Sequence, residues 1–412
     1  MGAVTRVGIE KIHAYPGTLS LSLADLCRAR EHDPADIRDV FLVDERSVVP
    51  PWEDPVTLAV NAARPLLAEE DRGRIGLLLV ASESGVDQEK PMSTWVHRFL
   101  ALPPTVRNLE VKHACYGSTG ALQLAVAWIA SGQAEGRKAL VVNTDISRAH
   151  LGRPWEFVLG AAAVAVLVSD RPRVLEVELG QSGVYTHEVS DLTRPTARVE
   201  TGNSETSLLS YLEALQGAYD DYVRQAPGAA DLDRHFARHV YHLPFGGMGF
   251  RAHKTLLARR GPVSKAEAWA HFERKSLASL RFVRRMGGTY GASPFLGLMG
   301  LVEGDERLRA GDRVGVFSYG SGSCGEMWSG FVGEEARAAV AEARLGEQLD
   351  ARRRVSVSEY EAVELSRAAA VDEGHYRTDR GAPAGLFESH YAGRGLLVFD
   401  GMAEFYRRYS WS

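Results

Sequence analysis

Short apolar runs alternate along the chain with longer segments in which apolar residues recur at helical spacing. Unbroken runs of aliphatic and β-branched residues are typical of strands buried on both faces, and apolar residues three or four positions apart indicate amphipathic helices. Strands are predicted at 39–43, 75–80, 139–142, 163–168, 174–179, 239–243, 313–318 and 394–399. Helices are predicted at 55–67, 118–130, 207–225, 250–259 and 334–345. This alternation predicts an α/β protein with substantial parallel sheet.

Length and composition narrow the class of protein. The chain has 412 residues, 45% of them hydrophobic, which is enough for two core-bearing units or one large two-lobed domain. The formal net charge of −5 argues against nucleic-acid binding through bulk charge. The longest apolar runs, near 121–130 and 161–168, are shorter than the ~20 residues that cross a bilayer, and no signal peptide is evident. Three widely spaced cysteines do not suggest a disulfide framework, so a reducing cytoplasm is expected.

Cys115 is the candidate nucleophile. It lies in VKHACYGSTGAL, just before a segment of good helix formers. The positive end of a helix dipole favours a thiolate, and the small residues Gly117, Ser118 and Gly120 allow close approach of a substrate. The alternative is that Cys115 is a small buried apolar residue, as most cysteines are.

Two further polar residues follow apolar runs, where α/β enzymes place functional groups. Glu83 ends the run LLVASE, and a carboxylate there can act as a base if its pKa is raised. His242 ends the run VYH before PFGGMG, and an imidazole there can stabilise an oxyanion or transfer a proton. The alternatives are a solvated or helix-capping loop acid for Glu83 and a satisfied core histidine for His242.

The remaining candidates are given structural roles. Cys324, in SGSCGEMWSGFV, precedes a strand-like segment and lacks the helix dipole, and Cys27 lies in an amphipathic helix. The stretch 315–325 is no nucleotide-binding fingerprint; we predict a tight turn lining a pocket, with backbone amides available to an oxyanion. The segments ACYGSTG and YGSGSCG resemble each other and suggest two related halves. His113 and Cys115 have no further ligands at metal-like spacing, so no metal site is predicted.

Taken in order along nearly the whole chain, these segments resemble the 3-hydroxy-3-methylglutaryl-CoA synthase family of the thiolase superfamily. The resemblance is carried by VGIEKIHAYPG, ADLCRAREHDP, PPWEDPVTLAVNAA, ASESGVDQEK, KHACYGSTGAL, ALVVNTDISR, GAAAVAVLVSD, YHLPFGGMG, GGTYGASPFLGL and SYGSGSCGEMWSG. It implies a layered αβαβα fold of two pseudo-symmetric halves, 1–170 and 171–412, with an insertion at about 184–235. It also implies a homodimer.

The resemblance implies roles for three residues. The catalytic cysteine of the family corresponds to Cys115, the general acid/base to Glu83, and the histidine to His242. Cys115 would take an acetyl group from a thioester, Glu83 would remove a methyl proton, and His242 would polarise the β-ketone that the enolate attacks. Water would then release the product. Residues expected to contact substrate are Gly288, Tyr290, Ser321, Ser323, Ser207 and Tyr211.

Three departures from the family pattern bear on the substrate. Gly288 stands where the family usually has Asn, which would weaken carbonyl positioning or enlarge the pocket. Gly247 stands where CoA-using members often have Lys. The stretch 192–215 keeps Arg194 and Pro195 but is more similar to members of polyketide assembly lines, which use acyl carrier proteins and install β-branches. Arg281, Arg284 and Arg285 are candidates for docking an acidic carrier protein, the alternative being an ordinary solvated helix face.

The leading hypothesis is therefore a synthase that condenses an acetyl or propionyl carrier-protein thioester with a β-ketoacyl carrier protein. The phosphopantetheine thioester of the carrier, or CoA, would be the substrate, with no bound cofactor. One alternative is a mevalonate-pathway synthase that uses acetyl-CoA and acetoacetyl-CoA. The other is a non-catalytic thiolase-like scaffold that binds carrier proteins. No nucleic-acid or membrane partner is expected.

Overall fold

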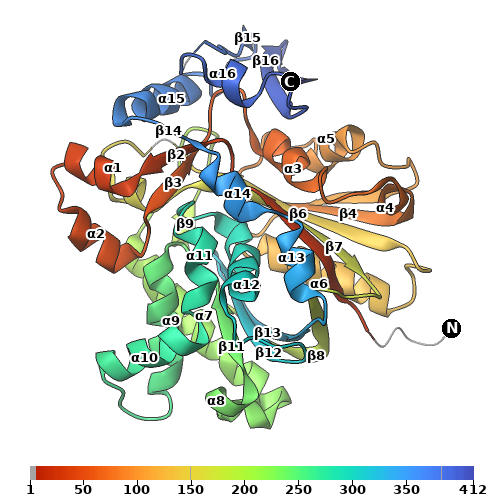
Figure 1. The fold of residues 1–412 in the computed structure, drawn as a ribbon, viewed down its shortest axis with the longest axis vertical. Helices are drawn as coiled ribbons and strands as arrows, with labels where there is room; N and C mark the ends of the chain where they lie inside the picture. Colours follow the sequence, from red (N-terminus) through yellow and green to blue (C-terminus); the bar gives the residue numbers. More distant parts are fainter. Residues whose placement is uncertain (1–5, 149, 382) are drawn as a thin grey trace.

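The computed structural model describes residues 6–148, 150–381 and 383–412, and its centre is a mixed sheet of nine strands (Figure 1). In spatial order the strands are β11 (Arg238–Tyr241), β12 (Arg313–Gly320), β13 (Cys324–Val332), β8 (Leu175–Thr186), β1 (Gly8–Tyr15), β7 (Ala161–Ser169), β6 (Lys138–Ile146), β4 (Ile75–Ala81) and β5 (Arg107–Val111).

Most neighbours in this sheet are antiparallel. Only β11–β12, β6–β4 and β4–β5 pair in parallel, so the expected share of parallel sheet was too high. Strands β6 and β7 pair with each other antiparallel, yet every residue in both is buried. Their unbroken apolar runs therefore reflect helices on both faces of the sheet, and not parallel pairing.

Helices cover both faces. Residues of β4 alternate between two cores: Leu77 and Leu79 face the core that contains α6 (Gly117–Ala130), and Leu78 and Val80 face the core that contains α3 (Pro55–Ala63). Helices α7 (Ser204–Gln225) and α12 (Ser293–Gly304) share the core of α6. This gives the expected layered α/β arrangement, with α3 and α6 on opposite sides of the strands (Figure 1).

The remaining elements lie around these layers. The other helices are α1 (Leu23–Ala29), α2 (Pro34–Phe41), α4 (Glu69–Arg74), α5 (Met92–Phe99), α8 (Leu232–His235), α9 (Gly246–Ala258), α10 (Lys265–Lys275), α11 (Leu280–Val283), α13 (Ala336–Ala341), α14 (Leu345–Asp350), α15 (Val357–Ala369) and α16 (Leu386–His390). Three small sheets join β14 (Arg353–Arg354), β2 (Leu19–Ser22) and β3 (Glu45–Val48); β9 (Leu192–Thr193) and β10 (Thr201–Gly202); and β15 (Tyr376–Arg377), β16 (Leu397–Ala403) and β17 (Tyr406–Trp411).

One predicted strand is wrong. The segment 39–43 ends helix α2 instead of forming a strand. Asp33 caps this helix by accepting a hydrogen bond from the Ala35 N–H, Pro34 occupies its first turn, and Leu42 ends it in the left-handed conformation. These local start and stop signals override the strand preference of the apolar run at 40–43. Within the described parts of the chain, no helix is both long and apolar enough to span a membrane.

Candidate active site

Cys115 lies in the loop that leads from β5 into α6. It precedes Tyr116, the residue that caps the helix, and follows Ala114, whose φ of +40° is in the left-handed region. A non-glycine residue in that region is strained and often marks a functional turn. The Gly117 N–H donates to the carbonyl of His113 at 3.1 Å, which closes the turn and presents Cys115 at the start of the helix.

Glu83 lies at the end of β4, beside Cys115. Each of the two side chains is among the groups that shift the pKa of the other, which makes them neighbours. Burial, followed by the negative charge of Asp145, raises the pKa of Glu83 to about 7. A carboxylate with this pKa can exchange a proton near neutral pH, as a general base requires.

The Cys115 thiol is held in its neutral form. Burial, and then the charge of Glu83, raise its pKa well above the ordinary value. This outweighs the helix dipole, which led us to expect a thiolate, because a buried thiolate beside a carboxylate pays for both desolvation and repulsion. Ionisation of the thiol therefore requires transfer of its proton, and Glu83 is the adjacent acceptor.

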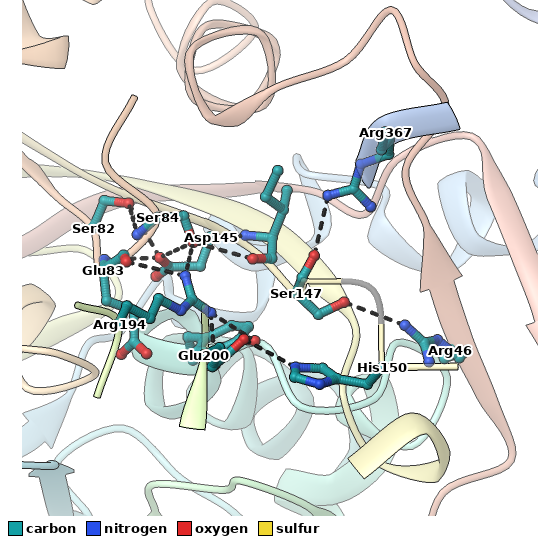
Figure 2. A network of polar contacts seen from close by, with 12 residues as sticks. Arg46, Ser82, Glu83, Ser84, Asp145, Ser147, His150, Arg194, Glu200 and Arg367 are labelled. Atoms are coloured by element: carbon teal, nitrogen blue, oxygen red, sulfur yellow. Dashed lines mark hydrogen bonds and ion pairs between the residues drawn. The ribbon is translucent and has the colours of Figure 1, made fainter. Parts of the chain in front are cut away.

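Asp145, at the end of β6, organises the loop that carries Glu83. Its Oδ1 accepts hydrogen bonds from the Ser82 hydroxyl, the Glu83 N–H and the Ser84 hydroxyl at 2.9–3.1 Å (Figure 2). Because β4 and β6 are adjacent and parallel, their carboxyl ends meet at one edge of the sheet. Asp145 was missed in the sequence, although it follows the apolar run 139–142 just as Glu83 follows 75–80.

His242 directly follows β11 and is buried. Its main-chain N–H donates to the Phe317 carbonyl at 2.7 Å, and its main-chain carbonyl accepts from the Tyr211 hydroxyl at 2.8 Å. Its ring Nδ1 lies 2.9 Å from the Ser293 Oγ. Burial lowers the pKa of His242 to about 3, so the ring is neutral at physiological pH. A neutral imidazole can stabilise a developing oxyanion by a hydrogen bond without adding a positive charge to the pocket.

The turn 290–293 contacts residues that lie next to Cys115, Glu83 and His242. The Tyr290 hydroxyl accepts from Arg194, which also binds the Glu83 carbonyl, and the Gly291 carbonyl accepts from the hydroxyl of Ser118 on α6 at 2.7 Å. Ser293 contacts His242 as described above. Tyr290 has a φ of +51°, a second strained non-glycine position at the site. The turn is therefore linked by hydrogen bonds to the segments that carry the thiol, the carboxylate and the imidazole.

Replacing Gly291 by alanine is expected to disturb this turn. A Cβ there would lie 2.8 Å from both the Cys115 carbonyl and the Asn143 Nδ2, and all of these atoms are buried or held by hydrogen bonds. Overpacking of this kind costs about 1–3 kcal/mol and moves the backbone, so we expect condensation to slow about tenfold or more. Gly346→Ala is the matched control, because nothing lies within 4 Å of its Cβ position. Equal rates for G291A and the parent would contradict the role of the turn.

The structure contradicts one of the two interpretations of Gly288, namely an enlarged pocket. A Cβ at this position would lie 2.3 Å from the Pro244 carbonyl oxygen, so the missing Asn side chain does not leave empty space for a bulkier acyl group. Both main-chain groups of Gly288 are also engaged: its N–H donates to Val158 and its carbonyl accepts from Gly160. Gly288 therefore allows the backbone to pass close to Pro244 on its way to Tyr290.

Of the other residues predicted to contact substrate, only some lie beside the candidate catalytic side chains. Tyr211 packs against His242, with ring centroids 6.3 Å apart. Ser207 lies one turn earlier on α7 and is half-buried, as is Ser321. The Ser323 hydroxyl is hydrogen-bonded to His187.

Two of the amides expected to be free in the 315–325 stretch are engaged at the turn between β12 and β13. The Gly322 N–H donates to Asp191 and the Ser323 N–H to the His187 carbonyl. Cys324 and Cys27 are both buried, consistent with the structural role predicted for them. In the residues that the structure describes, no group of three or more His, Cys, Asp or Glu is placed to hold a metal ion.

Known proteins similar to this chain share both its sequence and its fold. Residues 7–172 match the family described as "Hydroxymethylglutaryl-coenzyme A synthase N terminal" and residues 252–409 match its C-terminal counterpart. The chain is 35% identical to "Polyketide biosynthesis 3-hydroxy-3-methylglutaryl-ACP synthase PksG" of Bacillus subtilis (strain 168), covering 98% of this chain and 99% of that protein. It is 33% identical to the hydroxymethylglutaryl-CoA synthase of Enterococcus faecalis, covering 87% and 91%.

A crystal structure of the curacin biosynthetic pathway HMG synthase superposes with a TM-score of 0.93 at 37% identity, covering 99% of this chain and 100% of that one. That enzyme has also been solved in complex with acetyl donor-ACP. The protein is thus an acyltransferase of thiolase-like fold that forms carbon–carbon bonds. It belongs to the hydroxymethylglutaryl-CoA synthase family, which confirms the family and the fold predicted from the sequence.

Proposed function

We propose that this protein is a β-branching synthase of polyketide assembly, which condenses an acetyl or propionyl group from a donor carrier protein with a β-ketoacyl acceptor carrier protein. The proposal is supported by the hydrogen bonds that link the turn 290–293 to the segments carrying Cys115, Glu83 and His242. The near full-length similarity to PksG and to the curacin enzyme supports the choice of carrier-bound substrates.

The chemistry follows from the three side chains. The Cys115 thiol passes its proton to Glu83 and attacks the donor thioester, so that an acyl-cysteine forms and the carrier thiol leaves. Glu83 gives its proton to the departing carrier thiolate and, ionised again, removes a proton from the acyl α-carbon. The resulting enolate attacks the acceptor's β-ketone, and the new alkoxide takes the proton back from Glu83. Water then cleaves the bond to sulfur, which frees Cys115 and leaves a carboxylate on the product.

His242 is suited to the ketone of the acceptor. The Ser293 Oγ already accepts a hydrogen bond from the Leu243 N–H at 2.9 Å, so its own proton is free to be donated to His242 Nδ1. This arrangement leaves the imidazole proton on Nε2, as a donor to the oxygen that gains charge when the enolate attacks.

The packing of α2 supports carrier-bound substrates over CoA. A Cβ at Gly247 would lie 2.0 Å from the Val40 carbonyl oxygen, and one at Gly246 would lie 2.6 Å from that of Leu42. The end of α2 therefore fills the place from which the lysine of CoA-using relatives would project. Without that charge, less binding energy is available for the phosphates of CoA.

Intact-protein mass spectrometry tests the proposal. The protein is incubated with acetyl-loaded carrier, propionyl-loaded carrier or acetyl-CoA, and the acylated fraction is followed over time. We expect rapid acylation of Cys115 by a carrier-bound donor and slow acylation by CoA. Faster acylation by acetyl-CoA would favour the mevalonate-type enzyme. Absence of acylation with every donor would favour a non-catalytic scaffold.

Carrier docking through Arg281, Arg284 and Arg285 is a further part of the proposal. Each of the three already contacts an acidic side chain: Arg281 pairs with Glu303, Arg284 with Asp44 and Arg285 with Asp350. An acidic carrier would have to compete with these partners. Asp350, the partner of Arg285, is 73% exposed, so this pair contributes little stability and Arg285→Glu can test docking in the same acylation assay.

We also propose a homodimer formed through β5. This strand is one edge of the sheet, and the side chain of Leu109 on it is 49% exposed. An unpaired edge strand with an exposed apolar residue is a ready template for pairing with a second copy.

A further inference from the structure

Arg194 connects a surface segment to the backbone of the candidate base. It lies in residues 192–202, which we call the strap: strands β9 and β10 with the loop between them. Its Nη1 donates to the Glu83 carbonyl and to the Ser84 Oγ, both at 3.0 Å (Figure 2). Its Nη2 donates to Glu200 at 2.9 Å and to the Tyr290 hydroxyl at 3.0 Å.

The strap supplies the counter-ion of this arginine. Glu200, also in the strap, pairs with Arg194, and its second oxygen lies 3.0 Å from His150 Nε2. The Arg194 side chain is 12% exposed and that of Glu200 is 9% exposed. A buried charge needs such a partner, since an unpaired one costs several kcal/mol. The loop that carries Glu83 therefore does not have to supply a counter-ion for Arg194.

The remaining bonds of Arg194 end on neutral groups of the site. They reach the main chain of Glu83, the hydroxyl of the next residue, and Tyr290 in the turn 290–293. The guanidinium carbon also lies 5.1 Å from the centre of the Tyr290 ring. A carbonyl held in this way fixes the peptide plane of Glu83, and thereby the direction in which its carboxylate leaves the backbone. An arginine that served only to anchor the strap would not need to bind the main chain of the residue that carries the candidate base.

We propose that Arg194 is a positioning residue for enolate formation: by binding the Glu83 carbonyl and the Tyr290 hydroxyl together, it holds the Glu83 carboxylate against the acyl group on Cys115. This inference rests on the proposed function. The charges of Arg194 and Glu200 shift the pKa of Glu83 in opposite directions. The positive charge of Arg194 lowers the pKa of Glu83, whereas the negative charge of Glu200 raises it, both against the larger effect of burial.

The test separates deprotonation of the acyl group from its transfer. Arg194→Met, Arg194→Lys and Glu200→Gln are loaded from acetyl carrier protein or acetyl-CoA, whichever acylates the parent, and the acyl-enzyme is measured by mass. Uptake of deuterium into the acetyl methyl group is then followed in D2O as a function of pH. Arg198→Met is the matched control, because Arg198 lies in the same strap but pairs with the exposed Asp372.

We expect R194M still to form the acyl-enzyme, with a smaller loss of rate than that of deuterium uptake, because Glu83 also accepts the Cys115 proton during acylation. Deuterium uptake should fall up to about a hundredfold, the scale of a small misplacement of a catalytic group. Its pH midpoint should rise in R194M and fall in E200Q, while R194K should recover the midpoint but not the rate. R198M should match the parent.

The proposal is overturned if R194M takes up deuterium at the parental rate and with the parental pH midpoint. If R194M does not fold, the same result in R194K overturns it. A lower melting temperature alone would then mark Arg194 as a structural anchor. If the parent itself is not acylated by any donor, the proposed function has failed, and that result is distinct from failure of the positioning role.

Discussion

Replacing Cys115 by serine is expected to abolish the acyl-enzyme and to slow condensation by roughly three orders of magnitude or more. A hydroxyl is far less acidic than a thiol, and the pocket already opposes ionisation through burial and the charge of Glu83. A serine would be left protonated and a poor nucleophile. Intact mass after incubation with the acetyl donor, together with the steady-state rate, measures both effects.

Cys324→Ala is the control for the serine variant. Cys324 is buried in β13, and burial raises the pKa of its thiol as well, but Glu83 is not among the groups that shift it. We expect C324A to be acylated like the parent. Acyl transfer to the Cys115→Ser protein at the parental rate would show that the nucleophile lies elsewhere.

Replacing Glu83 by glutamine is expected to separate the two halves of the reaction. Acyl-Cys115 should still form, though more slowly, because the thiol loses its proton acceptor while the loss of the carboxylate charge lowers the pKa of the thiol. Loss of the α-carbon proton should slow by about 10²–10⁴-fold, the usual contribution of a positioned general base. The acyl-enzyme should therefore accumulate, and deuterium uptake into its methyl group should be nearly absent.

The parent enzyme should show the titration of this base. The pKa of Glu83 is raised to about 7, so the carboxyl is mostly neutral at pH 5 and mostly ionised at pH 8. Because only the ionised form accepts a proton, deuterium uptake should rise with pH through about 7 and then level off. The exposed Glu89, in the same loop, gives the control E89Q. Parental uptake in E83Q, or uptake that is independent of pH, would exclude Glu83 as the base.

The candidate catalytic residues could be predicted because each follows a recognisable local pattern. Glu83 and His242 end apolar strands, and Cys115 enters a helix through small residues, so their place at a sheet edge follows from periodicity. The resemblance to the synthase family then assigned their roles. What could not be predicted is how strands from distant parts of the chain pair, and this explains why Asp145 was missed: it matters only because β6 lies beside β4.

One of the two interpretations of Gly288, an enlarged pocket, was wrong for the same reason. A sequence shows that a side chain is missing at Gly288, but not that the backbone of Pro244 fills its place. Likewise, the cluster 281–285 looks like free positive charge until Asp44 and Asp350, far away in the sequence, are found against it. The helix at 34–41 could have been found from its cap residues, which were outweighed by the apolar run that follows.

The turn 290–293 has a consequence for how this enzyme can diverge. The segments that carry the proposed nucleophile, base and imidazole are all linked to one four-residue turn, which has no room for an added methyl group at Gly291. We expect a mutation there to disturb more than one chemical step, so selection for a new acyl group has little freedom to act on it. Tolerance to new substrates must arise in peripheral segments that can vary while the reacting atoms keep their geometry.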